Sequence, residues 1–323
     1  MTAADDHHHR KDTRSVPRHD INYARALEIS PMNPSQLALV LGGGGALGWV
    51  YHAGVLGALQ DRGLDLPNIG TVIGTSAGAA VAAAVRAGAD PGEIVATMAR
   101  PPSREQRERI LEEVRDARKS LRPLSPRLAR DAWHARGNGV LALSGLLPRG
   151  LFPTAFAEQF PGIPSLNGWP EGLWIPAVRA RDGEVVVFGR DRRDVAVASA
   201  VEASSAVPGM FRPKRIGGDD YIDGGAVSPT HAALALDAGG DTVLVSSPMT
   251  RPSRKFLARH ARRRLREEVK QLRDAGRRVV VVEPTHELMN VAAGFPRRNP
   301  TAAPSIERQA HQDVAAACAK AGI

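Results

Sequence analysis

Short apolar runs that lead into glycine-rich turns dominate the chain after residue 35. Residues 37–41 form a continuous apolar run that enters four glycines, and Thr71-Val72-Ile73 enters the turn Gly74-Thr75-Ser76-Ala77-Gly78. The segments that follow, 46–62 and 79–87, have the composition and spacing of helices. A strand, a turn and a helix repeated in this order predict an α/β protein with parallel strands joined by right-handed crossovers.

The later part of the chain continues this pattern with less regular spacing. Buried strands are predicted at 173–178, 184–188, 242–246 and 279–282, and a short strand at 221–222 leads into Asp223-Gly224-Gly225. Helices are predicted over 194–205 and over a long basic stretch at 252–275.

The polar segments suggest how the chain is divided. Residues 1–34 lack apolar periodicity and are predicted to be a disordered tail, with Met32 as an alternative start. Residues 35–295 form the predicted main domain, in which 91–150 is a helical insertion or lid. Residues 296–323 are polar and alanine-rich, which predicts a tail or a helix.

Composition narrows the function classes. The single cysteine, Cys318, excludes an internal disulfide, and no histidine or cysteine group has metal-ligand spacing, so no metal or cofactor is expected. No run reaches the roughly 18 apolar residues of a membrane span. The polar N-terminus predicts no secretory signal. We therefore expect a cytoplasmic protein, with peripheral membrane contact left open.

Ser76 occupies a turn typical of a catalytic nucleophile. In Gly74-x-Ser76-x-Gly78, between a strand and a helix, the serine hydroxyl is lifted clear of the sheet, and the glycines avoid clashes with neighbouring backbone. A simple helix cap in a glycine turn is the alternative, because this motif is only moderately specific.

Gly43, Gly44 and Gly45 form a loop of unencumbered backbone amides before a helix, with Gly48 one turn further on. Such amides can bind the oxyanion of acyl transfer or a phosphate. The spacing Gly-x-Gly-x-x-Gly also fits a dinucleotide site. That site needs an acidic residue after the second strand, whereas this strand ends in Gly-Thr-Ser.

The base that would activate Ser76 is the next question. Asp223 lies at a strand end before two glycines, where desolvation would make a carboxylate a better base. A Ser-His-Asp triad is the alternative, because four histidines follow Asp223 in the order of α/β-hydrolases. These histidines are His231, His260, His286 and His311.

Together these motifs resemble the patatin-like phospholipase family in its bacterial form. The glycine loop corresponds to 43–48, the nucleophile turn to 74–78 and the aspartate motif to 223–225, and 203–209 and 228–230 also match. The resemblance covers roughly 36–290. It implies a three-layer α/β/α fold with a mostly parallel sheet.

The resemblance also implies a mechanism. It assigns a Ser76–Asp223 dyad without histidine and an oxyanion hole from the amides of Gly43, Gly44 and Gly45. It implies a lipid or phospholipid ester as substrate and no cofactor. Many members carry Arg or Lys where this chain has Leu47, so charge beside the oxyanion loop is absent here.

The basic segment 251–278 is a second candidate for function. It holds twelve Lys or Arg and three Asp or Glu, within a net charge of +9. It predicts either contact with an anionic membrane or a scaffold helix with a charged outer face. Nucleic-acid binding is not expected, because no recognition motif accompanies the charge. A non-catalytic lipid-binding protein on the same fold also stays open.

Overall fold

The computed structural model describes residues 33–99, 103–118, 122–134, 138–250, 256–284 and 303–322. Residues 1–32 of the predicted N-terminal tail lie outside this part of the chain. Both candidate start sites, Met1 and Met32, are among them. His286 and residues 251–255 of the basic segment also lie outside the described residues.

In the described residues the strands form one eight-stranded sheet. Its order is β5-β6-β3-β2-β1-β7-β8, and β4 pairs with β3 outside this path. The four pairs that join β3, β2, β1, β7 and β8 are parallel, while β5, β6 and β4 are added antiparallel. The predicted mostly parallel sheet is therefore confirmed. The strands are β1 (Leu37–Leu41), β2 (Thr71–Gly74), β3 (Leu173–Arg179), β4 (Val185–Phe188), β5 (Lys214–Ile216), β6 (Asp219–Asp223), β7 (Thr242–Ser246) and β8 (Arg278–Val282).

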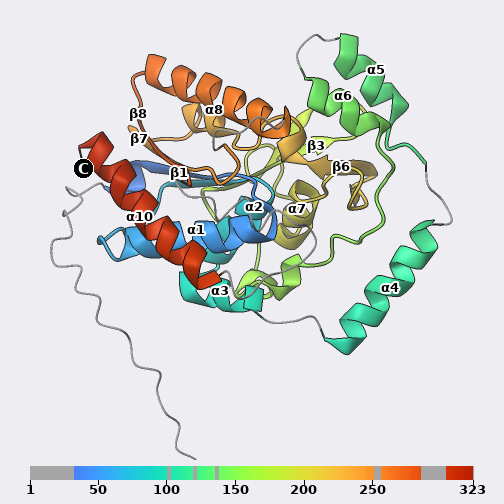
Figure 1. Cartoon of the computed structure of the whole chain (residues 1–323), viewed down its shortest axis with the longest axis horizontal. Helices are drawn as coiled ribbons and strands as arrows, with labels where there is room; N and C mark the ends of the chain where they lie inside the picture. The colour runs from blue at the N-terminus through green and yellow to red at the C-terminus, as the bar shows by residue number, and fades with distance from the viewer. Residues whose placement is uncertain are drawn as a thin grey trace, which may run out of the picture.

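Helices cover both faces of this sheet (Figure 1). α1, α2, α3 and α10 lie on one face and α8 lies on the other. The helices are α1 (Gly45–Gln60), α2 (Ala77–Arg86), α3 (Pro91–Ala99), α4 (Arg104–Arg118), α5 (Pro126–His134), α6 (Gly139–Leu146), α7 (Val197–Ser204), α8 (Phe256–Asp274) and α10 (Ala303–Ala321). Short 3-10 turns are η1 (Pro34–Gln36), η2 (Ala157–Gln159), η3 (Ile163–Ser165), η4 (Gly224–Ala226) and η5 (Ala232–Leu236).

The central strand β1 shows why the chain forms three layers. Every residue of β1 is buried, and successive side chains of a strand point to opposite faces. Leu39 and Leu41 join the core formed with α1 and α2. Ala38 and Val40 join the core formed with η5 and α8. A strand buried on both faces needs apolar residues throughout, and this explains the uninterrupted run in the sequence.

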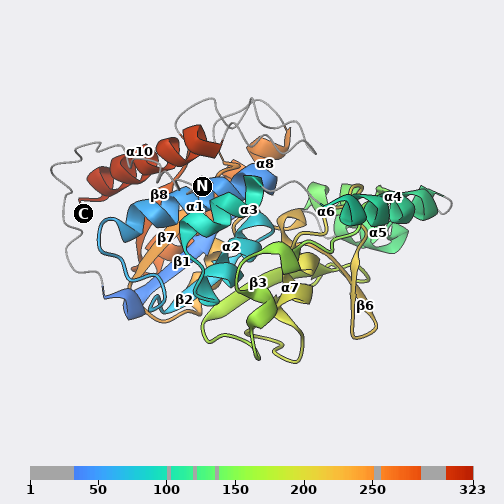
Figure 2. The ribbon, with the colours of Figure 1, turned by 90° about the horizontal axis from the view of Figure 1, so that it is seen from below.

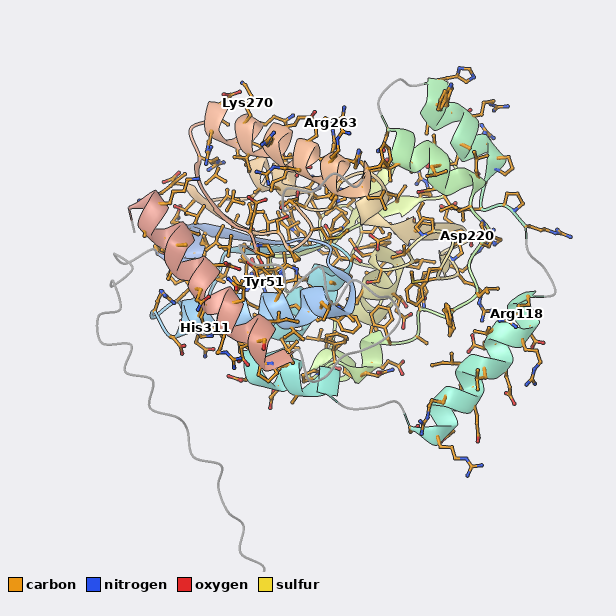
Figure 3. All side chains as sticks on the ribbon, viewed as in Figure 1. Tyr51, Arg118, Asp220, Arg263, Lys270 and His311 are labelled. Atoms are coloured by element: carbon orange, nitrogen blue, oxygen red, sulfur yellow. The ribbon has the colours of Figure 1, made fainter. Side chains whose placement is uncertain are left out.

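The C-terminal segment, predicted as a tail or a helix, forms the helix α10 and packs along α1. The contact is close because α1 has Gly54 at the crossing, where an added β carbon would lie 2.9 Å from the Ala310 Cβ. Beneath α10, the Tyr51 hydroxyl donates to the Asp313 carboxylate at 2.9 Å; Tyr51 is labelled in Figure 3. The layer outside α1 is thus supplied by the end of the chain.

The segment 91–150, predicted to be a helical insertion or lid, is divided in its packing. Within the described residues it forms α3, which packs against α1, and then α4, α5 and α6. The last three lie at the end of the molecule away from α10 (Figure 2). α5 and α6 pack on β3 and β6 through a small core that includes Leu128, Leu141, Val178 and Ile222. A function as a lid stays a prediction.

Candidate active site

The two predicted catalytic residues are brought together by β3. β2 pairs in parallel with the first residues of β3, at Leu173 and Trp174. β6 runs the opposite way and pairs with the last residues of β3, so that Asp223 lies opposite Ala177. The carboxyl ends of β2 and β6 therefore converge near the middle of β3, and they deliver Ser76 and Asp223 to the same place.

Ser76 lies in a strained turn between β2 and α2. Its φ is 54° and its ψ is −117°, a conformation that costs a non-glycine residue of order 1–3 kcal/mol. The surrounding structure holds it there, because the Ser76 amide donates to Ser204 Oγ at 2.9 Å. Ser204 Oγ in turn donates to the Pro176 carbonyl at 2.7 Å. Strain of this kind, maintained by neighbours, is typical of a functional residue.

The glycines that flank Ser76 have no room for a side chain. A β carbon on Gly78 would lie 1.9 Å from the Leu41 carbonyl oxygen, and one on Gly74 would lie 2.5 Å from the Gly78 carbonyl oxygen. Both distances are well inside van der Waals contact. The two glycines therefore let the turn fold tightly against β1, as the motif predicts.

The glycine loop lies directly beside the serine. A β carbon on Gly43 would lie 3.6 Å from the Ser76 Cβ. Gly44 is packed against the first turn of α1, where its β carbon would lie 2.6 Å from the Gly48 Cα. The loop follows β1 and the serine turn follows β2, and these two strands are parallel neighbours in the sheet. Their closeness therefore follows from the order of the strands.

The three amides predicted for the oxyanion hole are not equivalent. The Gly43 amide already donates to the Pro229 carbonyl at 2.8 Å, which differs from the expectation that it is free for an oxyanion. In the described part of the chain, no protein acceptor is recorded for the amides of Gly44 and Gly45. Gly45 is the first residue of α1, and the first amides of a helix have no partner within it.

Asp223 is a buried carboxylate with few stabilising donors. Its exposed fraction is 5%. Burial raises the pKa of this carboxyl to about 6, although hydrogen bonds from the Ser76 side chain and the Gly225 amide act in the opposite direction. The Gly225 amide donates to Oδ1 at 2.7 Å. A carboxylate with this pKa is a much better proton acceptor than one in water.

The aspartate motif depends on a second close approach of backbone. A β carbon on Gly224 would lie 2.6 Å from the Pro176 carbonyl oxygen. Gly224 therefore allows η4 to turn away directly after Asp223, while Gly225 supplies the amide that orients the carboxylate. These are the supporting positions that the sequence predicts for this motif.

His52 is a buried histidine beside the glycine loop that the sequence interpretation missed. Its Nε2 donates to the Gly42 carbonyl at 2.7 Å, so Nδ1 is the acceptor for Ser246 Oγ at 2.8 Å. Burial lowers the pKa of this histidine to about 4, and the neutral ring ties α1 and β7 to the start of the loop. This role of His52 is visible only from its contacts with Gly42 and Ser246, which lie 10 and 194 positions away in the sequence.

The late histidines are placed differently from a catalytic triad. In the part of the chain described, no hydrogen bond joins His231, His260 or His311 to Ser76 or Asp223. His231 comes nearest, because its Nδ1 lies 3.3 Å from Thr75 Oγ1. Burial lowers its pKa to about 3.

Apolar side chains lie beside the glycine loop. Met249 is 43% exposed, and its sulfur would lie 3.8 Å from a β carbon on Gly43. Leu47 is partly buried and packs against the main core. An uncharged residue therefore occupies the position after the glycine loop. Among the described residues, no cluster of three His, Cys, Asp or Glu could hold a metal ion.

Comparison with known proteins agrees with this architecture. The family model described as patatin-like phospholipase matches residues 39–236, which is more than half of the chain. The chain therefore belongs to the patatin-like phospholipase family, a family of lipid hydrolases. The match covers the glycine loop, the serine turn and the aspartate motif.

Two solved structures show more distant similarity. VipD from Legionella pneumophila is 14% identical, with a TM-score of 0.38, over 87% of this chain and 66% of that one. The type III effector protein ExoU is 18% identical, with a TM-score of 0.41, over 90% of this chain and 54% of that one. The chain thus spans less than two thirds of either protein. The family assignment rests on the family match and not on these similarities.

Proposed function

We propose that this protein hydrolyses ester bonds of lipids, with Ser76 as the nucleophile and Asp223 as the base. One observation carries the proposal: Ser76, held in a strained turn, lies close enough to the buried Asp223 carboxyl to lower its pKa, which burial raises to about 6. A serine hydroxyl is a weak nucleophile and needs such a partner within hydrogen-bond reach. A phospholipase A, a lysophospholipase and a simple esterase are all within this class.

The proposed reaction has two halves. Asp223 accepts the Ser76 hydroxyl proton while Oγ attacks the ester carbonyl carbon, and the carbonyl oxygen becomes negative. The leaving alcohol then takes the proton, which leaves an acyl-serine. In the second half Asp223 deprotonates water, which attacks the acyl group, and the proton returns to Ser76 as the acid departs.

We assign the oxyanion hole to the amides of Gly44 and Gly45. Both lie in the loop beside Ser76, and neither has a recorded acceptor in the described chain. The Gly43 amide has a different role in this proposal, because its bond to Pro229 fixes the loop. Loss of one oxyanion donor costs about 3–4 kcal/mol of barrier, so the loop position matters as much as the dyad.

Two variants test the dyad. Ser76→Ala should reduce hydrolysis of a p-nitrophenyl acyl ester to background, and Asp223→Asn should reduce it by about 10²- to 10⁴-fold. Ser165→Ala and Asp65→Asn, at an exposed serine and an exposed aspartate, are the matched controls and should keep full activity. Full activity in either dyad variant would refute the proposal.

The alternatives predict different results. A Ser-His-Asp mechanism would place the base on His231, the late histidine nearest the serine turn. His231→Gln would then abolish turnover, and the loss of activity in Asp223→Asn would be no larger than the loss in His231→Gln. A non-catalytic lipid-binding protein would leave Ser76 unlabelled by a fluorophosphonate probe. Our proposal predicts labelling of Ser76 and at least partial activity in His231→Gln.

We further propose that the outer face of α8 contacts anionic membrane from the cytoplasmic side. Ala261, Leu265 and Leu272 are buried on the inner face of α8. Arg263 and Lys270 point away from the rest of the protein (Figure 3). Near-surface basic residues contribute about 1 kcal/mol each on anionic lipid. Liposome sedimentation should show stronger binding with acidic lipid, and equal binding to neutral vesicles would contradict this. No helix in the described residues is long and apolar enough to span a membrane.

A further inference from the structure

The segment 228–232, which follows the aspartate motif, contacts the glycine loop. The Pro229 carbonyl accepts the Gly43 amide at 2.8 Å. The Thr230 methyl group lies 3.1 Å from the position of a β carbon on Gly42. The loop that carries the proposed oxyanion amides is therefore bounded on one side by this segment.

The same segment contacts the other two parts of the site through one side chain. His231 Nδ1 lies 3.3 Å from Thr75 Oγ1, next to the nucleophile. Its Cε1 would lie 3.1 Å from a β carbon on Gly224, next to Asp223. His231 is also one of the two non-glycine residues with positive φ, at 49°, among the described residues. This segment therefore contacts all three motifs.

A single buried carboxylate on α8 holds the segment in place. Glu268, which is 4% exposed, accepts Ser228 Oγ at 2.6 Å on one oxygen. Its other oxygen accepts Thr230 Oγ1 at 2.6 Å and the Ala232 amide at 2.9 Å. Three donors from five consecutive residues therefore converge on one side chain.

The fixed position of Glu268 comes from the helix that carries it. α8 packs against η5 and β8 and buries Leu265, Val269 and Leu272 on the same face as Glu268. Ser228 Oγ, which donates to Glu268, also accepts the His231 amide at 3.0 Å. The carboxylate thus connects a rigid helix to the residue that contacts both the serine turn and the aspartate motif.

We infer that Glu268 is a positioning residue: through segment 228–232 it holds the glycine loop at the distance from Ser76 that the oxyanion requires. This inference rests on the proposed function. It differs from a general structural role because the Gly44 and Gly45 amides bind charge only in the transition state. A small displacement of the loop should therefore lower kcat and leave substrate binding almost unchanged.

The test compares Glu268→Gln with Glu267→Gln on a soluble p-nitrophenyl ester. The NH2 of the glutamine side chain donates and cannot accept, so at one of the two oxygen positions of Glu268 it opposes a donor that now points at the carboxylate. We expect kcat to fall about tenfold or more, with KM within about twofold. Glu267 is the preceding residue on α8, 43% exposed and paired with Arg264 at 3.2 Å, and its variant should match the wild type.

A second variant keeps the inference testable if Glu268→Gln does not fold. Thr230→Val keeps the shape of the side chain and removes only the bond to the second carboxylate oxygen. It should lower kcat in the same direction, by about threefold to tenfold. In a double-mutant cycle, its effect should be largely absent once Glu268 is glutamine, because the two residues form one bond.

The outcomes separate this inference from the proposed function. A Glu268→Gln protein that melts at a lower temperature but keeps wild-type kcat well below that temperature would overturn the inference. Unchanged kcat in Thr230→Val would do the same. Failure of the wild-type protein to hydrolyse any ester or to label at Ser76 would instead overturn the proposed function, before Glu268 is considered.

Discussion

Two buried carboxylates accept hydrogen bonds from the segment that follows β6, and they differ in their donors. Asp223 is 5% exposed and Glu268 is 4% exposed. Asp223 accepts one backbone amide, from Gly225, and the nearby Ser76 side chain lowers its pKa. Glu268 receives two hydroxyls and one amide from the segment that it holds. Burial is the same, and the donors are different.

The difference indicates how one fold assigns two roles to the same chemical group. A carboxylate that is desolvated but only lightly hydrogen-bonded takes up a proton readily, and this suits a base. A carboxylate whose oxygens are all engaged by fixed donors is suited to hold a backbone segment in position. We therefore assign proton transfer to Asp223 and positioning to Glu268.

The pH dependence of activity should show the largest effect. Because Asp223 must be ionised to accept the Ser76 proton, kcat/KM should fall about tenfold per pH unit below its pKa of about 6 and level off above it. Initial rates on a neutral ester between pH 4 and 8 measure this. A plateau that extends unchanged to pH 4 would assign the base to another group.

The two carboxylates should affect stability in opposite directions. The pKa of Asp223 is raised in the folded state, from 3.8 to about 6, so its ionisation destabilises the fold, fully so above pH 6. Asp223→Asn should therefore raise the free energy of unfolding by up to about 3 kcal/mol at pH 8. At pH 4 most of this gain should be gone.

Glu268→Gln should lower the same free energy by about 1–3 kcal/mol, because a buried donor loses its acceptor. Urea denaturation of both variants and the wild type at pH 8 gives both values. Two changes of the same sign would mean that the hydrogen bonds of the two carboxylates do not distinguish their roles.

Ser204→Ala should show an intermediate effect, through the turn that carries Ser76. The Ser204 hydroxyl accepts the Ser76 amide and donates to Pro176, so its removal releases the strained turn. We expect kcat to fall about tenfold, with a stability loss of about 1–2 kcal/mol. Single-turnover kinetics with a p-nitrophenyl ester would show whether the acylation step is the one affected.

The positions of Ser76, Asp223 and the glycine loop could be predicted because each motif is local. A strand that ends in glycines before a helix is visible in a few consecutive residues, and the order of β1 and β2 then places the loop beside the serine. The same reasoning gave the strands of the parallel core almost to the residue. It missed β5, a three-residue strand with one buried side chain.

What the sequence could not provide are the contacts between distant residues. His52 contacts Ser246 across 194 positions, Ser204 contacts the Ser76 amide across 128, and Glu268 contacts Ser228 across 40. None of these pairs has a local pattern. The bond from the Gly43 amide to Pro229 is of the same kind, which is why a motif alone assigned three oxyanion donors.

The smallest expected effect is on the outer face of α8. Lys270→Gln removes a surface ion pair with Asp274, and such pairs contribute about 0–1 kcal/mol. It should leave kcat on a soluble ester unchanged. The free energy of unfolding should change by no more than about 0.5 kcal/mol. A large loss of activity would mean that α8 acts on the site by more than the contacts of Glu268.

The most direct test of the dyad is the rate at which a fluorophosphonate labels the protein, measured against pH and mapped by peptide mass spectrometry. We predict one adduct, on Ser76, with a labelling rate that rises through pH 6 and falls at least a hundredfold in Asp223→Asn. Labelling at another residue, or an undiminished rate on Ser76 in Asp223→Asn, would contradict the Ser76–Asp223 mechanism.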